Sequence, residues 1–101
     1  MITTDLDQKY STICSLYYCT LNPISKNRFL QVVQDVTHLC EYLEHTHAKS
    51  QQPQYRSRDV EQCGKTLRRI YSQNKSRELQ TAILEGLDAI IDSSRDIKNI
   101  E

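Results

Sequence analysis

The stretch FLQVVQDVTHLCEYL, residues 29–43, carries the most regular apolar pattern in the chain. Its apolar side chains recur at steps of three and four residues, at the a, d and e positions of a heptad. They are Phe29, Val32, Val33, Val36, Leu39, Cys40 and Leu43. A strand would show strict alternation instead. The spacing therefore predicts a helix over about residues 26–48, with Ser25 as its N-cap and these apolar side chains in the core.

Three further segments repeat the same spacing, over about residues 4–21, 58–73 and 77–97. Thr4 and Ser57 are suitable N-caps for the first and third of these helices, and Asn74 or Ser76 can cap the break between the last two. The pair Asn22-Pro23 ends the first helix, because the residue before proline is disfavoured in the helical region. The stretch SQQPQY, residues 50–55, is predicted to be a loop.

These segments predict a single helical domain over residues 1–101. The chain has only two glycines and two prolines, which favours long helices over a turn-rich β fold. Four helices joined by short loops favour an all-α, antiparallel, up-down-up-down four-helix bundle. The alternative is a three-helix bundle, in which the third and fourth segments run together and a dimer covers the remaining apolar surface.

Composition restricts the classes of function. Thirteen basic residues balance thirteen acidic ones, whereas dedicated nucleic-acid or membrane-surface proteins are usually strongly basic. No apolar run approaches the roughly 20 residues needed to span a bilayer, and the polar start MITTDLDQKY is unlike a signal peptide. We therefore expect a cytoplasmic protein without a membrane partner. The four cysteines fit no zinc-binding spacing and are interpreted as small apolar side chains.

All three histidines lie in HLCEYLEHTH, residues 38–47. On the heptad above, His38, Glu41 and His45 share the face opposite the core, so they are predicted to form a solvent-facing polar row. They are weak candidates for a metal site, because the two-fold Glu-x-x-His pattern of di-iron bundles and the HExxH zinc motif are both absent. No cofactor or small-molecule substrate is indicated, and no catalytic motif is present, so we predict that the protein is not an enzyme.

Charge is segregated along the second half of the chain. Residues 56–77 hold seven basic and two acidic residues, whereas residues 78–101 hold six acidic and two basic ones. One interpretation is that the third and fourth helices pair and partly neutralise each other. The other is that a basic patch of Arg58, Lys65, Arg68 and Arg69 binds an acidic partner, either a protein or a nucleic acid.

The stretch ICSLYYCTL, residues 13–21, is apolar around most of its circumference. Such a helix is normally covered on more than one side. Its predicted partner-binding residues are Leu16, Tyr17, Tyr18 and Cys19, and tyrosine is enriched at interfaces. The chain is therefore predicted to be an adaptor, inhibitor or regulatory subunit that binds another protein or a second copy of itself. The alternative is a nucleic-acid-associated regulator that uses the basic patch.

In size and helix count, and in no sequence motif, the chain resembles the small helical immunity proteins that protect bacteria from their own toxins. The resemblance implies a helical protein that acts by binding and inhibiting another protein.

Overall fold

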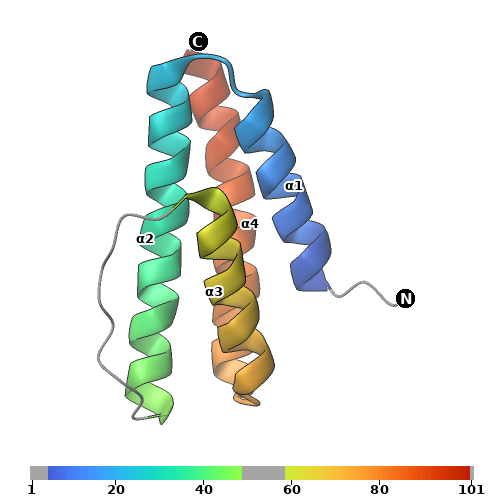
Figure 1. Cartoon of the computed structure of the whole chain (residues 1–101), viewed down its shortest axis with the longest axis vertical. Coiled ribbons are helices and arrows are strands. Elements are labelled where there is room, and N and C mark those ends of the chain that lie inside the picture. The colour runs from blue at the N-terminus through green and yellow to red at the C-terminus, as the bar shows by residue number, and fades with distance from the viewer. Residues whose placement is uncertain (1–4, 49–58, 101) are drawn as a thin grey trace.

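The computed structural model describes residues 5–48 and 59–100 of the chain, and it contains four helices (Figure 1). They are α1 (Asp5–Cys19), α2 (Pro23–Ala48), α3 (Val60–Gln73) and α4 (Arg77–Ile100). The predicted all-α four-helix bundle is confirmed. Residues 74–76 separate α3 from α4, so the alternative in which these segments run together is wrong. None of the helices, over the residues searched, is long and apolar enough to cross a bilayer.

The directions of the helices differ from the predicted up-down-up-down order. Near its end α2 carries Glu44, which is hydrogen-bonded to Arg69 and Asn74 at the end of α3, so α2 and α3 run parallel. Helices α1 and α4 both run the opposite way, which gives an up-down-down-up bundle (Figure 1). The up-down-up-down prediction assumed that a short loop joins each helix to the next one in the sequence. The eleven residues between α2 and α3 can span about 36 Å when extended, which exceeds the roughly 21 Å length of α3.

Local polar side chains fix the helix ends. Asn22 caps α2, because its Oδ1 accepts hydrogen bonds from the backbone N–H groups of Ile24 at 2.9 Å and Ser25 at 3.1 Å. Pro23 occupies the first helical position, where its missing N–H costs nothing. The prediction of Ser25 as N-cap is therefore wrong, since Ser25 lies inside the first turn. Thr4 and Ser57, the other predicted N-caps, lie outside the described residues.

Helix α3 begins with a capping box. The Asp59 carboxylate accepts a hydrogen bond from the backbone N–H of Gln62 at 2.8 Å, and the Gln62 side chain accepts one from the backbone N–H of Asp59 at 3.4 Å. At the other end Asn74 is the C-cap, and the Ser76 hydroxyl accepts a hydrogen bond from the backbone of Leu79 in α4 at 3.4 Å. Both predicted positions for this break are therefore used.

Replacing Asp59 with alanine is expected to destabilise the protein by about 1 kcal/mol, because the backbone N–H of Gln62 loses its side-chain acceptor at the start of α3. Urea unfolding monitored by circular dichroism measures this loss. Asp59→Asn, which keeps an acceptor at the same place, is the matched control and should lose at most a few tenths of a kcal/mol. Equal losses in both variants would contradict the role of the cap.

The core combines buried apolar side chains from all four helices. They are Leu6, Tyr10, Ile13, Phe29, Val33, Cys40, Val60, Cys63, Leu67, Ile70, Leu79, Ile83, Leu87 and Ile90. Helix α4 packs most extensively against α2 and then against α1, whereas α3 packs mainly against α2. Each helix thus buries one face, as its apolar spacing predicts.

For two residues of α2, the prediction that they lie in the core is wrong. Leu39 is 62% exposed and Leu43 is 38% exposed, whereas Thr37 and Glu44 are buried. The cause is geometric: an α-helix has 3.6 residues per turn, so a strict seven-residue stripe drifts by about 20° per heptad across the helix. The polar residues that replace the leucines have partners, since the Thr37 hydroxyl donates to the carbonyl of Val33 at 2.8 Å. Burying Thr37 and Glu44 therefore leaves neither side chain without a hydrogen-bond partner.

Helices α1 and α3 approach each other closely where Tyr10 crosses Gly64. The Tyr10 ring lies in the space that a Cβ at position 64 would need. Its hydroxyl donates to the backbone carbonyl of Val60, and burial, the largest cause, raises the pKa of Tyr10 above its usual value. Glycine at position 64 thus leaves the room that the Tyr10 ring needs, although glycine weakens a helix interior.

Candidate functional site

The predicted partner-binding residues of α1 divide into two pairs. Leu16 and Tyr17 are half-buried and pack against the core. Tyr18 is 54% exposed, and Cys19 is exposed as well. The end of α1 thus presents Tyr18 and Cys19 outward and packs Leu16 and Tyr17 against the core.

Two apolar side chains that are more exposed than Tyr18 lie a few residues further along the chain. Leu21 is 89% exposed and Ile24 is 72% exposed; the first helix was predicted to reach residue 21 but ends at Cys19. We name Tyr18, Cys19, Leu21 and Ile24 the apex surface, because they surround the connection between α1 and α2 (Figure 1). Helical spacing could not identify Leu21 or Ile24. The signal that could have done so is Asn22-Pro23, since residues in a tight turn cannot reach the bundle core.

Hydrogen bonds hold this connection in place. The buried Thr20 donates from its hydroxyl to the carbonyl of Leu16 at 2.7 Å and from its backbone N–H to the carbonyl of Tyr17 at 3.2 Å. Asn22 caps the following helix, as described above. The turn therefore satisfies its own polar groups and leaves its apolar side chains facing outward.

Aromatic and charged contacts also fix Tyr18. Its hydroxyl donates to the Glu61 carboxylate of α3 at 3.1 Å, and this hydrogen bond is the main cause that raises the pKa of Tyr18. The rings of Tyr17 and Tyr18 meet edge to face, 5.3 Å apart, and the Lys26 ammonium lies 4.8 Å and 5.7 Å from their centroids. Such contacts limit the rotamers of the exposed ring before any partner arrives.

The predicted basic patch is largely engaged within the bundle. Arg58 lies outside the described residues, and Lys65 is exposed. The Arg68 Nε lies 3.0 Å from Asp7 of α1, and Arg69 is paired with Glu44 of α2. On the acidic helix, Asp88 pairs with Lys9 of α1 at 2.5 Å. These pairs connect α3 and α4 to other helices, so they differ from the predicted neutralisation of α3 by α4.

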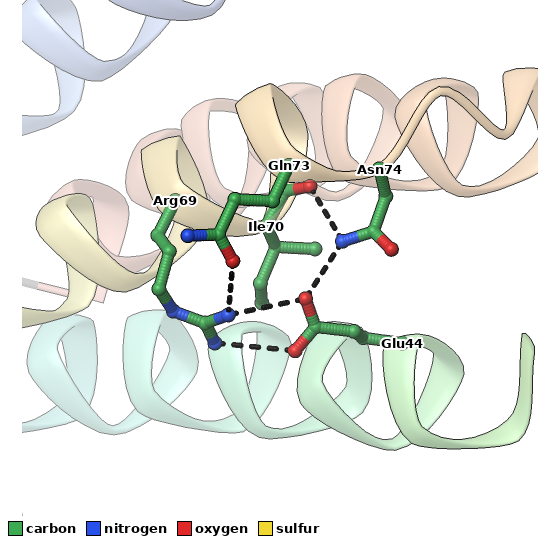
Figure 2. Close-up of polar contacts among 5 residues, drawn as sticks. All are labelled: Glu44, Arg69, Ile70, Gln73 and Asn74. Atoms are coloured by element: carbon green, nitrogen blue, oxygen red, sulfur yellow. Dashed lines mark hydrogen bonds and ion pairs between the residues drawn. The ribbon is translucent and has the colours of Figure 1, made fainter. Parts of the chain in front are cut away.

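The buried Glu44 is the centre of a polar cluster between the ends of α2 and α3 (Figure 2). Its two oxygens accept hydrogen bonds from the Arg69 guanidinium at 3.1 and 3.2 Å, and one of them also accepts from the Asn74 side chain at 2.7 Å. Arg69 also donates to Gln73 at 3.3 Å, and Asn74 donates to the Ile70 carbonyl at 2.9 Å. We name these five residues the Glu44 cluster; its groups satisfy each other, which indicates a structural role.

The histidine row is less exposed than predicted. His38, Glu41 and His45 are all half-buried, and the His38 ring meets the Tyr42 ring edge to face at 4.8 Å. Within the part of the chain that was searched, no three histidine, cysteine or acidic side chains are placed to hold a metal ion. The three residues do not form a metal site in this geometry.

The outer side of α2 carries apolar side chains that sequence reasoning placed in the core or did not consider. Besides Leu39 and Leu43, Tyr42 is 46% exposed. Leucine at a heptad position is ordinarily a core residue, so the pattern itself concealed this surface. These side chains are exposed because Thr37 and Glu44 take the core-facing positions of the helix.

All four cysteines are free thiols, and the burial of each depends on the face of the helix that it occupies. Cys40 and Cys63 are buried and Cys14 is half-buried, as expected for small apolar side chains, whereas Cys19 is exposed. Burial raises the pKa of Cys40 to about 11. A thiol with so high a pKa is poorly reactive at neutral pH.

No protein-family model matches the chain, and no curated protein or solved structure is significantly similar to it. The chain's own surfaces are therefore the basis for assigning a function.

Proposed function

We propose that the protein is a small, non-enzymatic adaptor, inhibitor or regulatory subunit that binds a partner protein through the apex surface. The observation that carries the proposal is the exposure of Leu21 and Ile24, 89% and 72%, on a turn whose backbone is fixed by hydrogen bonds. Fully burying a leucine or isoleucine side chain is worth about 1.5–3 kcal/mol. Within the described part of the chain, nothing explains why two such side chains are exposed at one turn.

The apex surface has the properties of an interface centre. Its residues come from a fixed turn and two helix ends, so little conformational entropy is lost when a partner binds. Tyr18 adds a ring with a polar tip, a residue type enriched at the centres of interfaces, and the ring of Tyr17, which packs on the core, meets it edge to face. Of the predicted α1 site, the proposed site keeps Tyr18 and Cys19 as exposed residues. It adds Leu21 and Ile24.

The nucleic-acid alternative has less support. Contacts to phosphates need cations that are available to a ligand, and each contributes to a steep salt dependence. Arg68 and Arg69 already pair with Asp7 and Glu44, which leaves Lys65 as the one exposed patch residue, among those described, for which no ion pair is shown. A cytoplasmic location is part of the proposal, because a reducing compartment keeps cysteines in the free form seen here.

The test is affinity capture from an extract of the cells that express the protein. The variant Leu21→Asp/Ile24→Asp changes two exposed side chains, so the melting temperature should stay within about 2–4 °C of wild type. We expect a specific partner protein to bind the wild type and at least about tenfold less of it to bind this variant.

Gln8→Asp/Ser11→Asp, which adds the same two negative charges at exposed positions of α1 outside the apex surface, is the control and should retain that partner. Retention of the captured protein by the apex variant would refute the proposal. Capture of nucleic acid that is released by raising the salt concentration would support the alternative instead.

A further inference from the structure

The exposed side of α2 is a second surface, separate from the apex. Leu39 and Leu43 lie one turn apart, 62% and 38% exposed, with Tyr42 beside them. From Ile24 to Leu39 the helix rises by about 22 Å, so one small contact cannot cover both regions. These leucines follow Val36, which is half-buried at the boundary with α4.

Helix α4 continues this apolar surface with small side chains. A Cβ at Gly86 would lie 2.7 Å from Cγ1 of Val36, which identifies the line of closest approach between α2 and α4. Helical periodicity places Ala82 and Ala89, at four residues before and three after Gly86, on the solvent side of that line. Ala82 is half-buried and Ala89 is exposed. We name Val36, Leu39, Leu43, Ala82, Gly86 and Ala89 the α2–α4 face.

Acidic residues border this face on both sides. On α4 the next residues outward are Glu85 and Asp92, which are exposed and one heptad apart, and on α2 the next is Asp35, also exposed. The described cation on this side of α2 is Arg28, two turns before Asp35. The middle of the face is therefore apolar between carboxylates.

We propose that the α2–α4 face docks an amphipathic helix of a partner protein whose apolar stripe is flanked by lysine or arginine. Exposed leucines beside small residues accept the apolar stripe of a helix, and the acidic borders attract its basic flanks. The proposal is independent of the apex surface and adds a partner of defined chemistry.

The charges argue against other occupants. A second copy that docked face to face would bring Asp35, Glu85 and Asp92 against like charges. The basic helix of a second copy, α3, already turns its apolar side into its own core through Cys63, Leu67 and Ile70. Phosphate groups of nucleic acids or anionic lipids would be repelled by the same acidic borders.

The test uses two synthetic helical peptides with the same leucine stripe, one flanked by lysine and the other by glutamate. Their binding to the full chain is followed by fluorescence anisotropy at about 50 mM and about 300 mM salt. We expect the lysine-flanked peptide to bind at least about tenfold more tightly than the glutamate-flanked one, and to lose several-fold in affinity at the higher salt concentration.

Variants locate the binding. Leu39→Asp and, independently, Ala89→Arg should each weaken binding of the lysine-flanked peptide at least about tenfold, and Glu85→Gln should weaken it several-fold. Gln8→Arg changes the net charge by one positive unit, as Glu85→Gln does, but at an exposed position of α1, and Leu21→Asp changes the apex. Both controls should bind as the wild type does.

Three results would overturn the inference: equal binding of the two peptides, binding that neither Leu39→Asp nor Ala89→Arg weakens, or a wild-type dimer in sedimentation that Leu39→Asp converts to a monomer. Because Leu21→Asp and Leu39→Asp alter different surfaces, this proposal and the apex proposal can fail separately.

Discussion

Replacing Gly64 with alanine is expected to destabilise the bundle by about 1–2 kcal/mol. Alanine is the better helix former by about 1 kcal/mol, so propensity alone predicts the opposite sign. The added Cβ, however, would overlap the Tyr10 ring, reaching 2.9 Å from Cδ1 and from Cζ and contacting Cε1 as well. The ring is 2% exposed, and its hydroxyl is bonded to the Val60 carbonyl, so it cannot move aside freely. Overpacking of this kind costs about 1–3 kcal/mol.

Gly86→Ala is the matched control, since both glycines lie inside helices. Its Cβ would meet a single methyl group, Cγ1 of the half-buried Val36, which can rotate away. The stability of Gly86→Ala should therefore lie within about 1 kcal/mol of wild type. Thermal unfolding distinguishes the two variants, because 1 kcal/mol corresponds to about 4–8 °C in Tm for a domain of this size. A Gly64→Ala variant that melts higher than wild type would show that the contact with Tyr10 is wrong.

Arg69→Ala is expected to destabilise the protein by about 2–3 kcal/mol. The variant removes both guanidinium hydrogen bonds to Glu44, whose side chain is only 9% exposed. A buried carboxylate that loses its cation retains most of its desolvation cost. Asn74 would remain as a neutral donor, at 2.7 Å, which limits the loss.

The adjacent arginine supplies the control. Arg68 pairs with Asp7, but the two side chains are 53% and 39% exposed, so Arg68→Ala should lose less than about 1 kcal/mol. Glu44→Leu should also lose less than Arg69→Ala, because an apolar side chain at a buried position needs no cation. Urea unfolding measures all three variants. Equal losses for Arg68→Ala and Arg69→Ala would mean that burial of Glu44 contributes nothing.

The sequence allowed the helices to be predicted because their cause is local. Apolar spacing located all four segments, and Asn74 and Ser76 were found at the break between α3 and α4, since caps act within one turn. Of the four predicted partner-binding residues, Leu16 and Tyr17 pack against the core, whereas Tyr18 and Cys19 are exposed. Whether they bind a partner stays a prediction.

Long-range choices could not be predicted in this way. Glu44 is buried in place of Leu43 because Arg69 and Asn74, distant in the sequence, supply its hydrogen bonds. The parallel course of α2 and α3 depends on the same contact and on a connection long enough to allow it. No periodicity within one helix identifies the distant partners of Glu44 or the order of the helices, so both were missed.

The up-down-down-up order also has a mechanical consequence. Helices α1 and α4 are parallel neighbours joined by the pair Lys9–Asp88, and the start of α1 and the end of α4 point in opposite directions along the bundle (Figure 1). A force applied to Asp5 and Ile100 therefore slides α1 along α4 and loads their contacts together, in shear. In an up-down-up-down bundle the two ends emerge side by side, and the same force would peel the contacts apart one after another.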